Sequence, residues 1–398
     1  MLYASEPLCD VRFCAASVKT VHWATEKWAQ IGELPIEIFN AYWDDRNSSL
    51  PMATPADQFT IRTIAHGLQA QFNDIPPIHC HVQVAEKEVD ERFTSTNNDH
   101  SSTVDEKIQN RSRNWLYVGL ARWVRVYASI AIPHEYTAHI ICLSPLHNKA
   151  TPIQLAEFVE IYRLMGAQHF TFYVHKQSLR DPNVVKLARH YAKENLATVV
   201  DWPVSAAHSY FYFDQRSALN DCLYRNLGYA RFTAILDLDE VMLPNRTGNS
   251  LIKLLTDTAD ANGSIASICF QHVLVHPHAD AHSVSPLRTL RRIRLAERVY
   301  PEGAVRSKCA HVTRKVAAVD IHTAQWLLRQ HHHVRYLART DALLLHYRPL
   351  MMHSLEKAQP AIRFVDDPIM RTRFQPLHLE ERVFQRLAEA GVKLVLNE

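Results

Sequence analysis

The segment Arg231–Pro244 reads RFTAILDLDEVMLP, and it decides the fold class. Its first part, Phe232–Leu236, is an apolar run of strand length, which is typical of a strand buried on both faces of a parallel α/β sheet. Asp237, Asp239 and Glu240 follow almost directly. Because α/β sheets bind their ligands at the carboxyl ends of their strands, the sequence predicts a ligand site here.

The two aspartates of this segment suggest a metal site. Asp237 and Asp239 are two residues apart, so on a regular strand their side chains would face the same side. Two oxygen ligands on one face suit Mg²⁺ or Mn²⁺, with substrate phosphates completing the coordination shell. The alternative is a solvated acidic turn without a metal. Three acidic groups next to a buried strand cost stability unless they are paired or metal-bound, which favours the metal site.

Composition indicates a globular protein. The 398 residues allow two or three domains of roughly 150 residues, or one large α/β domain with an extension. The hydrophobic fraction of 47% and the charged fraction of 21% are ordinary for such domains. The net charge of +3, without a long run of Lys or Arg, argues against a nucleic-acid partner.

Cysteines, glycosylation sequons and hydropathy bear on the compartment. The seven cysteines include no CxxC pair, so a zinc cluster is not expected. Asn-x-Ser/Thr sequons hint at a secretory compartment, and they begin at Asn47, Asn110, Asn245 and Asn262. No window approaches the roughly 18 to 20 apolar residues of a membrane span, and the first residues lack a signal-peptide pattern. The sequence as written therefore predicts neither an anchor nor a signal.

Residues 1–134 are predicted to form a β-rich extension with little chemistry of its own. Strand-like patterns occur at Glu37–Trp43, Gln58–His66 and Ile78–Val84. The polar residues 86–112 predict a loop or a disordered segment. The pattern of Asn114–Ser129 fits either a helix or a strand.

From residue 135 onward, strand and helix patterns alternate. Strands are expected at Ala138–Leu143, Phe170–Val174 and Ala197–Val200. Helices are expected from Thr151 to Gly166, after Asp181-Pro182, and at Tyr212–Leu227. This alternation predicts a doubly wound parallel sheet, with the acidic residues after its fourth strand. Neither GxGxxG nor GxxxxGK[ST] occurs, so a metal ion and side chains would hold phosphate.

Several stretches, in order, resemble glycosyltransferase family 92. They are Cys142–Tyr173, Asp214–Pro244 with its Asp-x-Asp-Glu, Arg306–Ala324 with its Val-x-x-His, and Ala342–Arg348 with its His-Tyr-Arg. AYWDDR at Ala41–Arg46 also resembles a segment upstream of the family's domain. The order and spacing of these stretches make the resemblance far more specific than a lone Asp-x-Asp.

The resemblance implies a fold, an activity and a compartment. The fold would be the GT-A nucleotide-diphospho-sugar transferase fold, a mixed and mainly parallel sheet flanked by helices, over residues 135–398. The activity would be metal-dependent, inverting transfer of a hexose, with UDP-galactose the favoured donor, to a glycan or glycoconjugate acceptor. Family members are usually Golgi membrane proteins, which implies a secretory-pathway lumen, at least one disulfide, and membrane contact only through an anchor missing from this sequence.

The resemblance also assigns metal ligands. Asp237 and Asp239 would bind Mn²⁺ or Mg²⁺, which stabilises the growing charge of the diphosphate leaving group. In this assignment Asp239 contacts the metal directly, whereas Asp237 reaches the metal or the ribose. A late histidine would be the third ligand, with His346 the first choice and His322 the second.

Other residues are assigned to the donor nucleotide and to the catalytic base. His147 and Asn148 lie where such enzymes bind the base and ribose, and Lys308 is a candidate counter-charge for the diphosphate. An inverting transferase needs a carboxylate that deprotonates the acceptor hydroxyl. Asp320 and Glu302 are the selected candidates, and the sequence does not choose between them and other late carboxylates.

Two alternatives belong to other classes. AILDLDEVML also fits the haloacid-dehalogenase phosphatase pattern, in which Asp237 would be the nucleophile and Asp239 the general acid/base. Such enzymes carry this motif on the first strand of their core. They also need a later acidic pair, and the candidate pair here, Asp366-Asp367, lacks a convincing strand before it. The second alternative is a non-catalytic glycan-binding relative, against which the intact Asp237, Asp239 and His346 argue.

Overall fold

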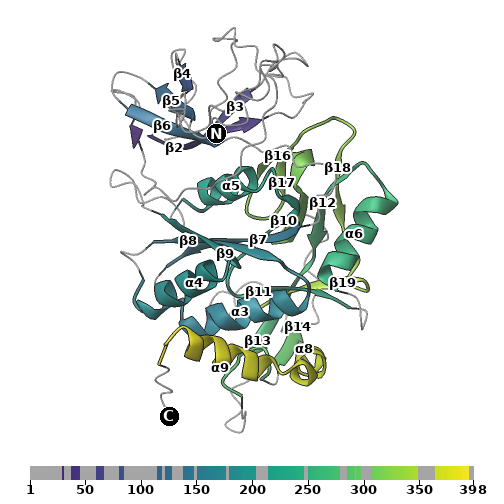
Figure 1. Cartoon of the computed structure of the whole chain (residues 1–398). Coiled ribbons are helices and arrows are strands. Elements are labelled where there is room, and N and C mark those ends of the chain that lie inside the picture. Colours follow the sequence, from purple (N-terminus) through teal and green to yellow (C-terminus); the bar gives the residue numbers. More distant parts are fainter. Residues whose placement is uncertain are drawn as a thin grey trace, which may run out of the picture.

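The computed structural model describes residues 29–30, 37–44, 60–66, 80–84, 114–118, 122–127, 138–147, 150–175, 179–202, 214–245, 250–277, 285–291, 293–296, 306–347 and 364–393. The predicted loop at residues 86–112 lies outside them. The amino-terminal strands form one sheet (Figure 1): β1 (Ala29–Gln30), β2 (Glu37–Asp44), β3 (Thr60–His66), β4 (Cys80–Val84), β5 (Asn114–Val118) and β6 (Arg122–Tyr127). The three predicted strands are confirmed, and the ambiguous stretch forms the hairpin β5–β6. The division into two domains stays a prediction.

A seven-stranded mixed sheet forms the centre of the molecule. Its order is β18 (His333–Tyr336), β12 (Ile265–Phe270), β15 (Lys308–Val312), β10 (Ala230–Leu236), β7 (Ala138–Leu146), β8 (His169–Val174) and β9 (Ala197–Asp201). The strands β10, β7, β8 and β9 are parallel, as the alternating pattern predicts. The strand β15 is antiparallel to both of its neighbours, so the whole sheet is mixed. The α/β class is therefore confirmed.

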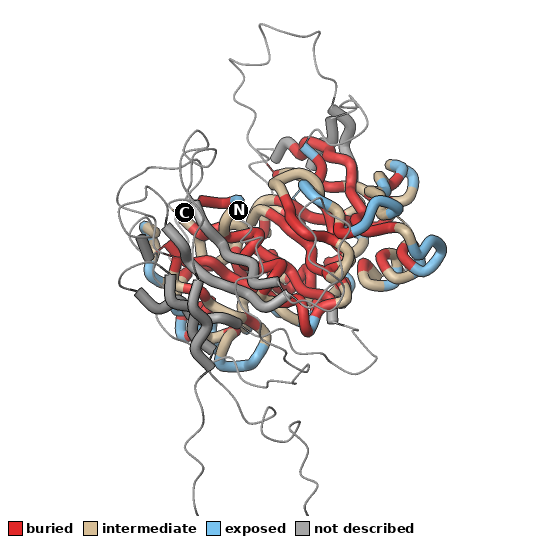
Figure 2. Tube along the Cα trace, turned by 90° about the horizontal axis from the view of Figure 1, so that it is seen from above, coloured by how far each residue is buried: buried red, intermediate tan, exposed pale blue. Residues whose placement is uncertain are grey.

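Helices cover both faces of this sheet (Figure 1). They are α3 (Pro152–Leu164), α4 (Asn183–Lys193), α5 (Gln215–Arg225), α6 (Leu251–Ala261), α8 (Ile369–Phe374) and α9 (Leu379–Glu389). Successive strand residues face opposite sides: Ile141 packs in the core with α3 and α4, whereas Cys142 packs in the core with α5. The buried residues run through the middle of the molecule (Figure 2). Among the described residues, no helix is both long and apolar enough to cross a membrane.

Local signals set the bounds of α3. Thr151 and Gln154 form a capping box, since each side chain accepts a hydrogen bond from the other residue's backbone N–H. After the last turn, Gly166 has φ +102°, and an added Cβ would lie 2.7 Å from Ile252. Only glycine fits this close approach in a left-handed conformation, which explains the predicted stop.

Two disulfides cross-link the core. Cys142–Cys222 joins β7 to α5, and Cys269–Cys309 joins the paired strands β12 and β15. The predicted presence of at least one disulfide is confirmed.

A second sheet begins where β10 ends. Its order is β11 (Glu240–Pro244), β19 (Ala342–His346), β13 (His272–Pro277), β14 (Ile293–Ala296) and β20 (Phe364–Asp367). A small hairpin, β16 (Val316–Val319) and β17 (Ala324–Leu327), packs beside α5. The chain passes from the central sheet into the second sheet through the Asp237–Asp239 segment, which places the acidic residues between the two sheets.

Candidate functional site

The acidic segment is a tight turn rather than a continuing strand. β10 ends before Asp237 and β11 begins at Glu240. The Glu240 N–H donates to the Asp237 carbonyl at 3.2 Å, and the Asp237 N–H donates to Glu240 Oε2 at 2.9 Å. Residues 237–239 lie between the two strands, so the regular-strand geometry that would place Asp237 and Asp239 on one face does not apply. The two carboxylates contact different partners.

A partly buried arginine contacts the turn from the side. Arg288 donates to the Leu238 carbonyl and lies over the Tyr347 ring, 5.5 Å from its centroid. Glu157 on α3 fixes the segment that carries Arg288, since its Oε1 accepts from the Thr289 N–H at 2.8 Å. Burial raises the pKa of Glu157, although Arg288 opposes that shift. Sequence reasoning missed Glu157 and Arg288, because no local pattern connects residues so far apart in the chain.

Asp237 is anchored by a buried lysine. Lys308 Nζ lies 2.8 Å from Asp237 Oδ2 and 3.4 Å from Glu240 Oε2. Gln215 Nε2 donates to Asp237 Oδ1 at 2.9 Å and to Ser144 Oγ at 2.6 Å. Burial alone would raise the pKa of Asp237 and lower that of Lys308, but their mutual attraction outweighs it, so the pKa of Asp237 is lowered and that of Lys308 raised. Both groups are therefore charged at neutral pH.

Asp239 faces a pair of histidines. His346 Nε2 lies 3.3 Å from Asp239 Oδ2, while His346 Nδ1 lies 2.8 Å from His272 Nε2 and 3.7 Å from Glu240 Oε1. Burial raises the pKa of Glu240 to about 7 against the opposing effect of Lys308, and burial followed by repulsion from His346 lowers that of His272 to about 3. The structure thus brings the predicted Asp239 and His346 together.

The Asp239–His346 pair fits a divalent cation. A carboxylate oxygen and an imidazole nitrogen are ordinary ligands of Mn²⁺. Two atoms bound at right angles to one ion, each about 2.1 Å from it, lie about 3 Å apart, which is close to the separation of Nε2 and Oδ2. Asp237 fits less well, because Lys308 and Gln215 already contact its two oxygens.

The other predicted residues lie in varied surroundings. His322 Nδ1 lies 3.0 Å from the Ser307 carbonyl, and burial, then repulsion from Lys308, lowers its pKa. Asp320 pairs with Arg216 at 2.9 Å. His147 follows β7, the parallel neighbour of β10, whereas Asn148 and Glu302 lie outside the described residues.

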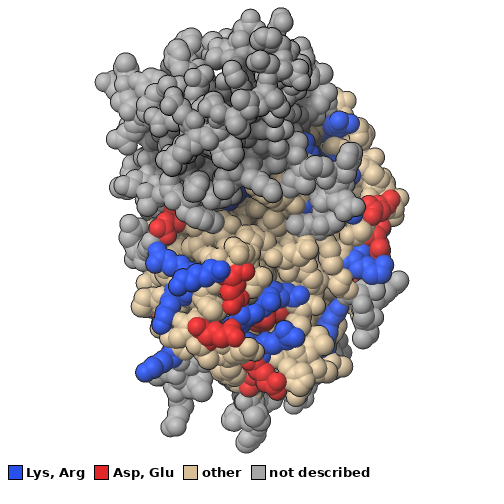
Figure 3. All heavy atoms as spheres, viewed as in Figure 1, with Lys and Arg blue, Asp and Glu red and all other residues tan. Residues whose placement is uncertain are grey.

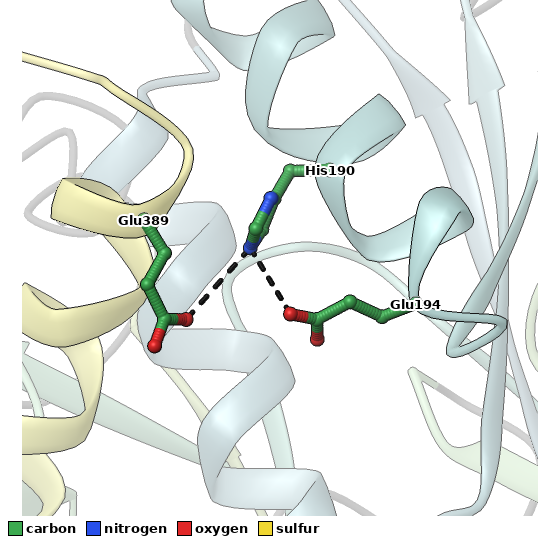
Figure 4. A group of neighbouring side chains, drawn as sticks. All are labelled: His190, Glu194 and Glu389. Carbon is green, nitrogen blue, oxygen red and sulfur yellow. Dashed lines mark ion pairs between the residues drawn. The ribbon is translucent and has the colours of Figure 1, made fainter.

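A second charged cluster joins α4 to α9 (Figure 4). His190 Nε2 lies 3.3 Å from Glu194 and 3.8 Å from Glu389, and it is the one group of three possible metal ligands that the described residues bring together. However, Arg386 Nη1 lies 2.9 Å from both oxygens of Glu194 and from Glu389 Oε2. A guanidinium therefore already neutralises these carboxylates. Acidic and basic side chains intermingle over α3, α4 and α9 (Figure 3), and this cluster is an ion-pair network of that surface.

Comparisons with known proteins identify the family of the chain. Residues 137–383 match the model of Glycosyltransferase family 92. A similar protein is the Beta-1,4-galactosyltransferase galt-1 of Caenorhabditis elegans, 26% identical over 130 residues, which are 32% of this chain and 30% of that protein. The match thus spans less than a third of the relative's length. Among solved structures, the WbbM bifunctional glycosyltransferase in its apo form is 12% identical over 39% of this chain and 28% of that chain, with a TM-score of 0.21, which is too low to support an argument.

Proposed function

Because the chain belongs to glycosyltransferase family 92, we propose that it transfers a hexose from a nucleotide sugar to a glycan acceptor with inversion at the anomeric carbon. The name of the similar galactosyltransferase supports UDP-galactose as the donor to test first. We further propose the GT-A fold for residues 135–398. Its support is the parallel run β10–β7–β8–β9 with helices on both faces and a carboxylate turn at its carboxyl end.

The observation that carries this proposal is the Asp239–His346 pair at the end of β10. Asp239 and His346 would hold Mn²⁺ or Mg²⁺, with Asp237 and His322 as further candidates. When bound, the cation would stabilise the negative charge on the departing diphosphate as a Lewis acid. The hydrogen-bonded turn keeps Asp239 in place before any ligand arrives, which lowers the entropic cost of binding.

Asp237 and Lys308 act as a unit in this mechanism. Lys308 is completely buried, so its ammonium contacts the carboxylates of the turn rather than solvent. It keeps Asp237 ionised and oriented, and Asp237 can then accept a hydrogen bond from a donor hydroxyl. Lys308 also offsets part of the negative charge of Asp237 and Glu240, which an incoming diphosphate would approach. This effect is weaker than the predicted role, in which Lys308 is the counter-charge of the diphosphate. His147 and Asn148 stay the candidates for the nucleotide base and ribose.

Asp320 and Glu302 stay the candidates for the catalytic base. Asp320 accepts hydrogen bonds from Arg216 at 2.9 Å and from the Ile321 N–H at 2.7 Å. Because Arg216 contacts the carboxylate, Asp320 would reach an acceptor hydroxyl once Arg216 has turned to another partner. The Arg216 side chain is 71% exposed.

The test of this function is UDP binding and sugar transfer on the wild type and on Asp239→Asn. We expect calorimetry to give tighter UDP binding with Mn²⁺ than with EDTA, and Asp239→Asn to abolish most of that difference. UDP-galactose should be consumed faster than other UDP-hexoses when glycan acceptors are supplied. Equal UDP binding with and without metal would contradict the proposal. Phosphate release from phosphomonoesters without UDP binding would favour the phosphatase, although Asp237 follows the fourth strand of its region and not the first.

We propose a secretory-pathway lumen, such as the Golgi, as the compartment. The two buried disulfides support it, because such bridges are rare in reducing compartments. The expected partners are the nucleotide sugar and a glycan or glycoconjugate.

A further inference from the structure

We infer that Arg288 is a positioning residue for the candidate metal site: its guanidinium holds together the two segments that carry Asp239 and His346. This inference rests on the proposed metal-dependent function, and it names a residue that neither the sequence motifs nor the comparisons single out. Arg288 is not itself a ligand, because a guanidinium has no lone pair to offer a cation.

One guanidinium contacts both segments. Arg288 Nη2 donates to the carbonyl of Leu238, the residue between the two aspartates, and the guanidinium carbon lies 5.5 Å from the centroid of the Tyr347 ring. Tyr347 directly follows His346, and its N–H donates to the Asp239 carbonyl at 2.8 Å. Because Arg288 contacts a chain neighbour of each proposed ligand, it can fix the position of one ligand relative to the other.

The segment that carries Arg288, residues 285–291, is anchored away from the site. Leu287 is fully buried in the core that includes α3. Glu157 Oε1 on α3 accepts from the Thr289 N–H at 2.8 Å, and its Oε2 lies 3.7 Å from Arg288 Nε. These contacts limit where the guanidinium can lie before any ligand binds.

The charge of Arg288 makes positioning and electrostatics predict opposite results. A positive charge beside a cation site repels the cation, so by charge alone the loss of Arg288 would strengthen Mn²⁺ binding. If Arg288 instead holds the Leu238 carbonyl, its loss loosens the turn, and Mn²⁺ must then order Asp239 at an entropic cost. The direction of the change in affinity therefore separates the two effects.

The experiment replaces Arg288 by Met, which keeps an apolar stem of similar length but has neither a donor nor a charge. Arg288→Lys is the conservative variant, because an ammonium can still donate to the Leu238 carbonyl. Arg291→Met is the matched control. Arg291 lies on the same segment, and its Nε donates at 3.1 Å to the carbonyl of Ser285, which is not part of the turn.

Binding of Mn²⁺, with and without UDP, is measured by the loss of the free-ion signal in electron paramagnetic resonance. We expect Arg288→Met to weaken Mn²⁺ binding about 10-fold or more, Arg288→Lys to recover part of this loss, and Arg291→Met to stay within about threefold of wild type. Unchanged or tighter binding by Arg288→Met, or an equal loss in either of the other variants, would overturn the inference alone. Absence of Mn²⁺ binding by the wild type, with and without UDP, would overturn the proposed function as well.

UDP binding in EDTA separates positioning from direct contact with the nucleotide. A residue that acts only on the metal site leaves this affinity unchanged, so Arg288→Met should bind UDP in EDTA as the wild type does. A loss of affinity there would show that Arg288 binds the diphosphate, and would overturn the inference.

Hydrogen exchange of the wild type tests the inference without a variant. If Arg288 orders the turn, the amides of Glu240 and Tyr347 are protected in the metal-free protein, since both donate to carbonyls of the turn. Saturating Mn²⁺ and UDP should then slow their exchange less than about tenfold. Amides that become protected only with Mn²⁺ would show that the ion orders the turn, and would overturn the inference even if Arg288→Met fails to fold.

Discussion

Lys308 Nζ and Asp237 Oδ2 lie 2.8 Å apart, at the junction of the two sheets that form the candidate site. The lysine is completely buried, whereas the aspartate side chain is 32% exposed. Glu240, almost fully buried, lies 3.4 Å from the same ammonium. One buried cation therefore supports two carboxylates of the Asp-x-Asp-Glu turn, and this support is independent of any metal.

Replacing Lys308 by Met should destabilise the fold and disturb the turn. The substitution leaves Asp237 and Glu240 without their cation, and an uncompensated buried charge costs about 3–5 kcal/mol, which we reduce to about 2–3 kcal/mol because Asp237 is partly exposed. Chemical denaturation measures the loss. Stability within about 0.5 kcal/mol of wild type would contradict this role of Lys308.

Replacing Arg386 by Gln should weaken the attachment of α9 to α3 and α4. Arg386 Nε lies 3.3 Å from Glu160, whose side chain is 1% exposed, and Nη1 contacts Glu194 and Glu389. We expect a loss of about 2 kcal/mol, because a nearly buried carboxylate loses a partner. Lys253→Gln is the control: its pair with Asp257 is about 60% exposed on both sides and should contribute less than about 0.5 kcal/mol. Equal effects of the two substitutions in urea unfolding would refute the network.

The sequence predicted the parallel half of the sheet because each strand there is a local apolar run, as at Phe170–Val174. It could not predict β15 in the middle of the sheet, since antiparallel insertion between β10 and β12 depends on pairings far apart in the chain. The same limit applies to the site. The motif identified Asp239 and His346, but the contact of Lys308 with Asp237 and that of His272 with His346 depend on strand register.

Expression through a secretory pathway should attach a glycan to Asn262 and not to Asn245. Asn262 is exposed beside the amino end of β12, where its Oδ1 accepts from the Ser264 N–H at 2.9 Å. Asn245 instead donates to the Arg339 carbonyl, and its buried Oδ1 has no hydrogen-bond partner among the described residues. A glycan on Asn245 would therefore break this contact and prevent native packing.

Mass spectrometry of peptides after enzymatic deglycosylation in heavy-oxygen water identifies the modified asparagine. The strands β12 and β10 are both antiparallel to β15, so they run in the same direction. The amino end of β12 therefore lies at the end of the sheet opposite to the Asp237 turn, which follows the carboxyl end of β10. Asn262→Gln should therefore lose the glycan with transfer activity unchanged. Folded protein that carries a glycan on Asn245 would contradict the prediction.

Replacing His139 by Phe should make the protein less sensitive to acid. His139 on β7 is fully buried, lies edge-on to Phe232, and has no hydrogen-bond partner for either ring nitrogen among the described residues. Burial lowers its pKa to about 4 from the usual 6.5. Between these values the unfolded chain binds a proton that the folded chain does not, so the stability contributed by the neutral imidazole is present above pH 6.5 and is lost as pH falls towards 4.

The expected size follows from the same linkage. Between pH 7.5 and pH 5, a shift of this size costs about 2 kcal/mol of unfolding free energy. His139→Phe removes that dependence and keeps the ring contact with Phe232, so the variant should lose about 2 kcal/mol less than wild type over this interval. Urea unfolding at both pH values measures it, and the other buried histidines contribute equally to both proteins. Parallel pH profiles for the two proteins would mean that His139 is already protonated in the fold, or that it finds a partner in solution.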